Sequence, residues 1–236
     1  MQSSILLVGS AERLPVFQEV FHVCFPSVDI FSISKHKPLT VSKNSLNVIQ
    51  DSDGVLLTSA LALSGVDTEV LQRFPPFYCV GKKSAEMVRA LGGQVAYEGI
   101  DSAQGLVRAL IKEDKISQKF VHLCGTSSGD DWYVNIRENS GNITPVLTYK
   151  AFYKNEISPS EQKRIEAAKA LVFLSQAALE KTQAICIKYN VETLDKAIVC
   201  LSRDIALKAK GWKSVSWADK PQKESLIKAV ELAVEY

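Results

Sequence analysis

Apolar and polar positions alternate along the chain in a pattern that predicts short buried strands separated by helices. Ten short apolar runs are bounded by polar turns, which is typical of strands covered on both faces. Amphipathic stretches lie between them, most clearly at residues 84–93, 101–114 and 222–236. This alternation predicts an α/β fold of parallel strands with helical crossovers. The expected strands are Ile5–Val8, Val28–Ile33, Val55–Thr58, Phe77–Val80, Gln94–Tyr97, Phe120–Cys124, Ile143–Tyr149, Ala170–Leu174, Ala197–Leu201 and Lys213–Trp217.

The pattern of strand ends repeats within the chain. Ser59 and Ser175 both follow an apolar strand and lie 116 positions apart. The same interval separates Gly9 from Gly125 and the strand end at Ile33 from the one at Tyr149. Three markers at one interval predict two similar five-stranded α/β units.

The repeat alone leaves two arrangements of these units open. The units could follow one another, at about 1–116 and 117–236. Alternatively, residues 38–150 form one domain, and residues 1–34 combine with 154–236 to form the other, with linkers at about 35–37 and 150–153. Polar stretches at Ser34–Pro38 and Lys154–Ser160 favour the second arrangement, although Lys112–Lys119 is also polar.

Composition narrows the function classes. The formal net charge is +2 and acids and bases are mixed, which argues against a nucleic-acid or anionic membrane surface. The first residues lack a signal-peptide pattern, and the five cysteines include no CxxC, so we expect reduced thiols in a cytoplasmic protein. The three histidines show no metal-ligand spacing, so no metal site is expected. The chain also lacks GxGxxG, GxSxG and P-loop motifs.

Loops at the carboxyl ends of the strands carry the candidate ligand-binding residues. Open α/β sheets bind ligands at this edge, and helix starts there offer backbone N–H groups to anions. For any single loop, a serine that caps the helix is the simpler reading. For the whole set, a cleft for a polyanion between two domains is an equal alternative. The candidates are Thr58, Ser59, Gly81, Lys82, Lys83, Ser84, Gly125, Thr126, Ser127, Ser175, Ser202 and Arg203.

Several of these segments together resemble uroporphyrinogen-III synthase. They are "VLLTSALAL", "VGKKSAEMVRALGG", "DSAQGLVRAL", "VLTYKAFY", "LVFLSQAAL" and "CLSRDIALKAKGWKSVSWADKP", and the likeness runs from about Ile5 to Glu235. The resemblance implies two flavodoxin-like parallel-sheet domains joined by a two-stranded linker, one of them discontinuous, with the active-site cleft between them.

The resemblance also implies a function. Such an enzyme closes the linear tetrapyrrole hydroxymethylbilane to uroporphyrinogen III, inverts the last pyrrole and loses water, and it needs no metal or organic cofactor. The substrate carries acetate and propionate arms, so it is a polyanion that backbone N–H groups and hydroxyls would hold. The task of the protein would be to fix the substrate's conformation. We expect a monomer that binds neither nucleic acid nor membrane.

Individual residues carry the likeness unevenly. Tyr149 matches a family tyrosine proposed to assist loss of the hydroxyl, whereas without the resemblance it would be a packing residue. Thr58 and Ser59 match a strand-end hydroxyl pair, Ser84 stands in the place of a threonine, and Ser175 matches a serine of the other domain.

Two segments depart from the family pattern. An Arg-Pro pair usually ends the first strand, but "VGSAER" leaves that basic contact missing or moved to Arg13. Ser202 and Ile205 stand where glycine and a hydroxyl residue are common, so binding there would depend on Arg203. The rival interpretations are a two-domain small-molecule binding or sensor protein without chemistry and a scaffold that works through a protein partner.

Overall fold

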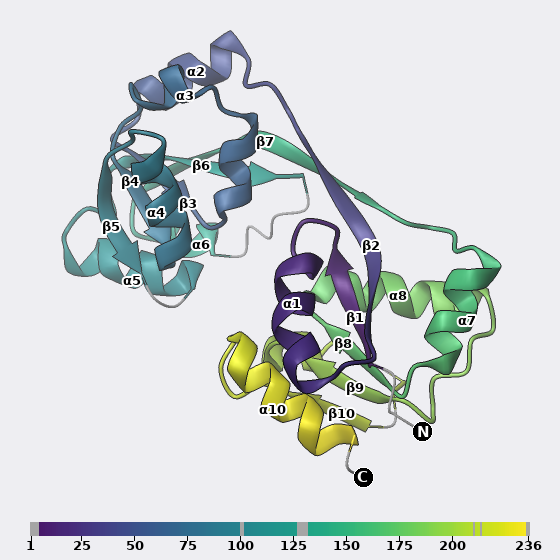
Figure 1. The fold of residues 1–236 in the computed structure, drawn as a ribbon. Coiled ribbons are helices and arrows are strands. Elements are labelled where there is room, and N and C mark those ends of the chain that lie inside the picture. The colour runs from purple at the N-terminus through teal and green to yellow at the C-terminus, as the bar shows by residue number, and fades with distance from the viewer. Residues whose placement is uncertain (1–4, 100–101, 127–131, 210, 213, 235–236) are drawn as a thin grey trace. The chain divides into compact units, whose positions relative to one another are not determined.

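The computed structural model describes residues 5–99, 102–126, 132–209, 211–212 and 214–234, and its strands and helices alternate throughout (Figure 1). All ten expected strands are present, which confirms the α/β fold. The strands are β1 (Ile5–Ser10), β2 (Val28–Pro38), β3 (Gly54–Leu57), β4 (Phe77–Val80), β5 (Val95–Gly99), β6 (Lys119–Gly125), β7 (Asn142–Tyr153), β8 (Ala170–Phe173), β9 (Ala197–Cys200) and β10 (Ser214–Trp217).

The helices begin where local sequence favours a helix start. Ser102 caps α5 by accepting a hydrogen bond from Gly105 N, and Ser158 forms a capping box with Glu161 at the start of α7. The helices are α1 (Leu14–Cys24), α2 (Lys43–Gln50), the 3-10 helix η1 (Ala60–Gly65), α3 (Thr68–Leu71), α4 (Lys82–Ala90), α5 (Ala103–Lys112), α6 (Tyr133–Glu138), α7 (Pro159–Ala167), α8 (Gln176–Lys188), α9 (Arg203–Ala206) and α10 (Lys223–Val234).

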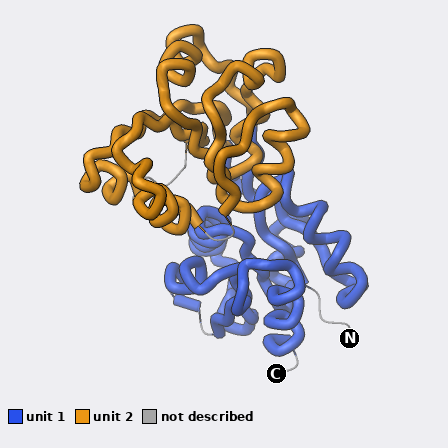
Figure 2. The backbone as a smooth tube through the Cα atoms, turned by 90° about the vertical axis from the view of Figure 1, so that its left-hand side faces the viewer, with its two compact units in different colours: residues 1–36, 152–236 blue, residues 37–151 orange. Residues whose placement is uncertain are grey.

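The chain divides into two compact units, which Figure 2 colours blue and orange. Unit 1 comprises residues 1–36 and 152–236, and unit 2 comprises residues 37–151. The chain passes from one unit to the other within β2 and within β7. That each unit is an independent domain, with the boundaries expected above, stays a prediction.

Strands β2 and β7 are longer than the sequence pattern predicts. The polar stretch Ser34–Pro38, expected as a crossing, belongs entirely to β2, and β7 continues past Tyr149 to Tyr153. Backbone hydrogen bonds accompany this extension: Leu39 N donates to Thr148 O at 2.8 Å, and Lys154 N donates to Ile33 O at 2.8 Å. Extended backbone satisfied by a neighbouring strand needs no apolar pattern, so periodicity could not find it.

The sheets of the two units have the same strand order in space. In unit 1 the order is β2-β1-β8-β9-β10, and in unit 2 it is β7-β6-β3-β4-β5. The pairings β1–β2, β1–β8, β6–β7 and β3–β6 are parallel. Strands β1, β2, β8, β9 and β10 of unit 1 therefore correspond to β6, β7, β3, β4 and β5 of unit 2.

The register of this internal repeat differs by one residue from the expectation at two of its three markers. A bulge pairs Ser10 with Ser34 in unit 1, and the matching bulge pairs Gly125 with Tyr149 in unit 2, which makes these equivalents 115 positions apart. Gly9 and Ile33 are therefore not the counterparts of Gly125 and Tyr149. Ser59 and Ser175 are true counterparts, because both follow equivalent strands and begin the next helix.

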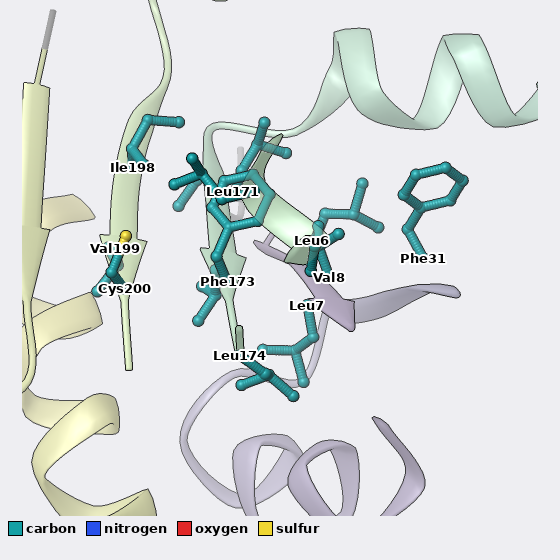
Figure 3. Close-up of a cluster of buried hydrophobic side chains, with 14 of the residues drawn as sticks. Leu6, Leu7, Val8, Phe31, Leu171, Phe173, Leu174, Ile198, Val199 and Cys200 are labelled. Atoms are coloured by element: carbon teal, nitrogen blue, oxygen red, sulfur yellow. The ribbon is translucent and has the colours of Figure 1, made fainter. Parts of the chain in front are cut away.

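Buried aliphatic and aromatic side chains cover both faces of the strands. Leu6, Leu7, Phe173 and Leu174 belong to one core cluster in unit 1 (Figure 3). In unit 2 one cluster includes Val55 and Leu57, and a second includes Leu56, whose side chain lies on the opposite face of β3. A sheet packed on both faces leaves the ends of its strands as the place where polar chemistry can reach a ligand.

Candidate active site

The carboxyl ends of four neighbouring strands form one edge of the sheet in unit 2. Because β7, β6, β3 and β4 lie side by side in parallel, Tyr149, Gly125, Thr58 and Gly81 follow one another along this edge. The structure therefore brings together the candidates of unit 2: Thr58, Ser59, Gly81, Lys82, Lys83, Ser84, Gly125, Thr126 and Tyr149. Ser127 lies outside the described residues.

Tyr149 lies against the backbone of Gly125. A Cβ atom at Gly125 would overlap the ring carbons of Tyr149 and lie 2.8 Å from its hydroxyl oxygen. Thr126 N also donates to Tyr149 O at 3.2 Å, and Ala151 N donates to Thr126 Oγ1 at 3.4 Å. Only glycine at position 125 leaves room for this ring, so the loop after β6 sets the position of the tyrosine.

Thr58 belongs to a polar network that the sequence pattern did not predict. Its Oγ1 lies 2.9 Å from Nε2 of His122, and Nδ1 of His122 lies 2.5 Å from the hydroxyl of Tyr133. His122 and Tyr133 are 1% and 4% exposed. Burial lowers the pKa of His122 to about 4, so the ring is neutral at pH 7. The histidine inside the apolar run "FVHLC" is the signal in the sequence that points to a buried polar partner.

The start of α4 combines a left-handed glycine with two lysines. Gly81 has φ +85°, which favours glycine, and it has no side chain to cap the helix. Lys82 and Lys83 are exposed in the first turn, and Lys82 is 3.6 Å from Glu86. Cations near a helix N-terminus are disfavoured by about 0.3–1 kcal/mol. An anion bound at this end of the helix would make the position of the two lysines favourable. Ser84 is buried, so its side chain packs under the helix.

Two candidate serines act as helix caps in the structure. Ser59 accepts a hydrogen bond from Leu61 N at 3.3 Å, and Ser175 accepts one from Ala178 N at 3.2 Å. The simpler reading of these two side chains therefore holds, although a capping hydroxyl still has a proton to donate.

The remaining candidates lie in unit 1, where Ser175, Ser202 and Arg203 follow the neighbouring strands β8 and β9. Ser202 stands at the start of α9 but makes no side-chain capping bond there, and Arg203 is exposed. Arg13, expected as a substitute for the missing Arg-Pro contact, donates from Nη1 to Leu174 O at 3.1 Å. Its guanidinium therefore lies next to the end of β8.

Within the described part of the chain, no group of three or more His, Cys, Asp or Glu side chains is placed to hold a metal ion. No described helix is long and apolar enough to span a membrane. The five cysteines are free, and burial raises the pKa of Cys79 and Cys200 to about 12 and that of Cys186 to about 11. These three thiols stay protonated at neutral pH, which makes them poor nucleophiles.

Comparison with known proteins decides the family. The family model "Uroporphyrinogen-III synthase HemD" matches residues 23–228. The chain belongs to the uroporphyrinogen-III synthase family. It is thus an enzyme of tetrapyrrole biosynthesis, a cyclising lyase, and the family implies hydroxymethylbilane as its substrate. The product is uroporphyrinogen III, formed with inversion of the last pyrrole and loss of water. The interpretation as a binding protein without chemistry is not favoured.

Solved structures of uroporphyrinogen-III synthases share the fold. The enzyme from Helicobacter pylori 26695 is 16% identical, with 99% of each chain covered and a TM-score of 0.68. A mutant enzyme from the extremely thermophilic bacterium Thermus thermophilus is 13% identical, with 99% of each chain covered and a TM-score of 0.65. A search of curated proteins finds no match to this sequence. At these identities the comparison concerns the fold, and the roles of single residues rest on the geometry above.

Proposed function

We propose that each unit is a flavodoxin-like domain, that β2 and β7 link them, and that the carboxyl edge of the unit 2 sheet holds hydroxymethylbilane. The strand order supports the first part, because β2-β1-β8-β9-β10 is the flavodoxin order 2-1-3-4-5 when strands are numbered along the module. The order in unit 2 is the same after circular permutation. Ligands of such sheets bind at the carboxyl ends of the strands.

The start of α4 supports binding of the substrate's carboxylate arms. Its backbone N–H groups and the ammonium groups of Lys82 and Lys83 both attract anions, and they come from one turn of helix. Thr58, Ser59 and Thr126 add hydroxyls along the same edge. Ser175, Ser202 and Arg203 of unit 1 are proposed as further contacts to the same substrate.

The single observation that carries the catalytic proposal is the position of Tyr149 over Gly125 at this edge. We infer that the phenol assists departure of the hydroxyl group as a proton or hydrogen-bond donor. The rest of the site fixes the conformation in which the last pyrrole inverts, so that the uninverted ring does not form first.

Incubation of the purified chain with hydroxymethylbilane, without any added cofactor, tests this proposal. We expect the inverted isomer, uroporphyrinogen III, in place of the spontaneous uninverted product. Tyr149→Phe should lower turnover by about ten- to a thousandfold, against the roughly 10²- to 10⁴-fold typical of positioned proton donors. Because the leaving group departs readily, the lower end is expected. Binding of uroporphyrinogen III by the variant should barely change. Unchanged turnover in the variant would return Tyr149 to a packing role.

A further inference from the structure

Two buried side chains, Tyr133 and His122, and the half-buried Thr58 form a polar chain in unit 2 that ends at the proposed site. Tyr133 is linked to His122, and His122 is linked to Thr58 at the carboxyl end of β3. The indole of Trp132 packs edge-on against the imidazole, with ring centroids 5.0 Å apart. Each ring nitrogen of His122 has one hydroxyl neighbour, Oγ1 of Thr58 at Nε2 and the Tyr133 hydroxyl at Nδ1.

The direction of the hydrogen bonds follows from donor strength. A neutral imidazole has one donor nitrogen and one acceptor nitrogen. The phenol of Tyr133 is a more acidic donor than an aliphatic hydroxyl, and its short 2.5 Å contact is to Nδ1. With the phenol as the stronger donor, the geometry assigns Nδ1 as the acceptor and Nε2–H as the donor to Oγ1 of Thr58. The Thr58 proton then points away from His122, and this hydroxyl acts as a donor at the sheet edge.

Unit 1 shows that the fold does not need this polar chain. His122 pairs with Leu56 and Pro145 in the sheet, and the equivalent Leu7 pairs with Val172 and Ile30. The counterpart of Thr58, two residues beyond Leu56, is Leu174, two residues beyond Val172. Leu7 and Leu174 are both buried in the apolar core (Figure 3). The same strand positions are thus stable with apolar side chains.

We propose that His122 and Tyr133 are positioning residues for the synthase reaction, which hold the Thr58 hydroxyl as a hydrogen-bond donor to a carboxylate arm of the substrate. This inference rests on the proposed placement of hydroxymethylbilane at the unit 2 edge. Burying polar groups carries a desolvation penalty, and the apolar version in unit 1 avoids it. In return, a Thr58 hydroxyl that is already oriented binds the carboxylate more tightly, because its rotation does not have to be fixed on binding.

A double-mutant cycle between Tyr133→Phe and Thr58→Val tests the proposal. Tyr133→Phe removes the hydroxyl that contacts Nδ1 of His122. It should raise KM about three- to tenfold with little change in kcat. Thr58→Val should raise KM at least as much. The double variant should equal Thr58→Val alone, because Tyr133 acts only through Thr58. Tyr78→Phe is the matched control, since it removes a phenol hydroxyl from the same unit but leaves Tyr133, His122 and Thr58 unchanged.

Three results separate the alternatives. Additive effects of the two substitutions, or a fall in kcat alone, would overturn the positioning role. If the double variant does not fold, ¹⁵N NMR of the wild-type imidazole still decides: we expect the proton of His122 on Nε2, and a proton on Nδ1 would overturn the inference. Failure of the wild-type chain to form uroporphyrinogen III would instead sink the proposed function, whatever the imidazole shows.

Discussion

The two units share a strand order but differ at the carboxyl ends of their equivalent strands. At the matching bulges, unit 2 pairs Gly125 with Tyr149, whereas unit 1 pairs Ser10 with Ser34. Unit 2 thus combines the smallest residue with an aromatic ring that fills its space, and unit 1 uses two small residues. The strand architecture accepts either pair, and in unit 2 the ring of Tyr149 also packs against the core cluster that includes Val55 and Leu57.

The same contrast holds one strand pair further into the sheet. Unit 2 has a polar pair, the half-buried Thr58 and the buried His122, where unit 1 buries Leu174 and Leu7. Apolar residues pack these positions without leaving polar atoms to satisfy. The comparison therefore separates residues that build the module, which are apolar in both units, from residues that only one unit needs.

A pH titration of stability should show the largest effect of this difference. Burial lowers the pKa of His122 to about 4, against an ordinary value of 6.5. Below pH 6.5 His122 is protonated in the unfolded chain but stays neutral in the folded chain. The free energy of unfolding therefore decreases as the pH falls below this value. The loss should approach about 3 kcal/mol at pH 4.

Urea unfolding of the wild type and of His122→Leu between pH 7 and pH 4.5 measures this loss. The variant copies Leu7, so its stability should fall less steeply with pH than that of the wild type. Parallel curves for the two proteins would mean that His122 does not resist protonation in the folded state.

Gly125→Ala probes the tyrosine pair. The added methyl group overlaps the ring of Tyr149, so the ring has to move, and we expect kcat to fall about ten- to a hundredfold. Ser10→Ala is the matched control at the equivalent bulge of unit 1. Its hydroxyl is buried and has no hydrogen-bond partner among the described residues, so kcat should stay unchanged. Equal kcat values for wild type and Gly125→Ala would show that Tyr149 needs no fixed position.

The smallest effect is expected for the helix caps that the units have in common. Ser175 caps α8, a helix of 13 residues, so Ser175→Ala should lower the free energy of unfolding by about 1 kcal/mol. Ser59→Ala should cost less, because η1 is a short 3-10 helix of 6 residues. Urea unfolding of both variants compares them, and a larger loss for Ser59→Ala would reverse this ranking of the caps.

The sequence alone was enough to predict the strands and the repeat. The ten apolar runs mark strands covered on both faces. Every side chain of such a strand is buried, so the run is apolar at each position and is visible in the sequence. The register was wrong by one residue because Gly9 and Gly125 were matched by residue type, whereas strand pairing sets β1 and β2 115 positions before β6 and β7 along their whole length. The polar continuation of β2 through Ser34–Pro38 was missed because backbone pairing, which needs no apolar side chains, extends the strand.

The site was predictable where it uses backbone and loop chemistry. Gly81, Lys82 and Thr58 follow strands, so their shared edge follows from parallel pairing. The partnership of Thr58 with His122 and Tyr133 was not predictable, because it depends on which side chains face each other across β3, β6 and α6. The contact between the Tyr149 ring and Gly125 was not predictable either, because it depends on the position of the bulge.

Converting the polar chain of unit 2 to the apolar form of unit 1 tests the central claim most directly. A variant with Thr58→Leu, His122→Leu and Tyr133→Phe carries leucine at both strand positions. It removes the polar side-chain atoms of all three residues together, so none of them is left without its partner. At pH 7 its free energy of unfolding in urea should equal or exceed that of the wild type, while kcat/KM for hydroxymethylbilane should fall at least about tenfold. Wild-type activity in this variant, or a loss of more than about 3 kcal/mol of stability, would contradict the claim that unit 2 keeps these polar groups for the reaction.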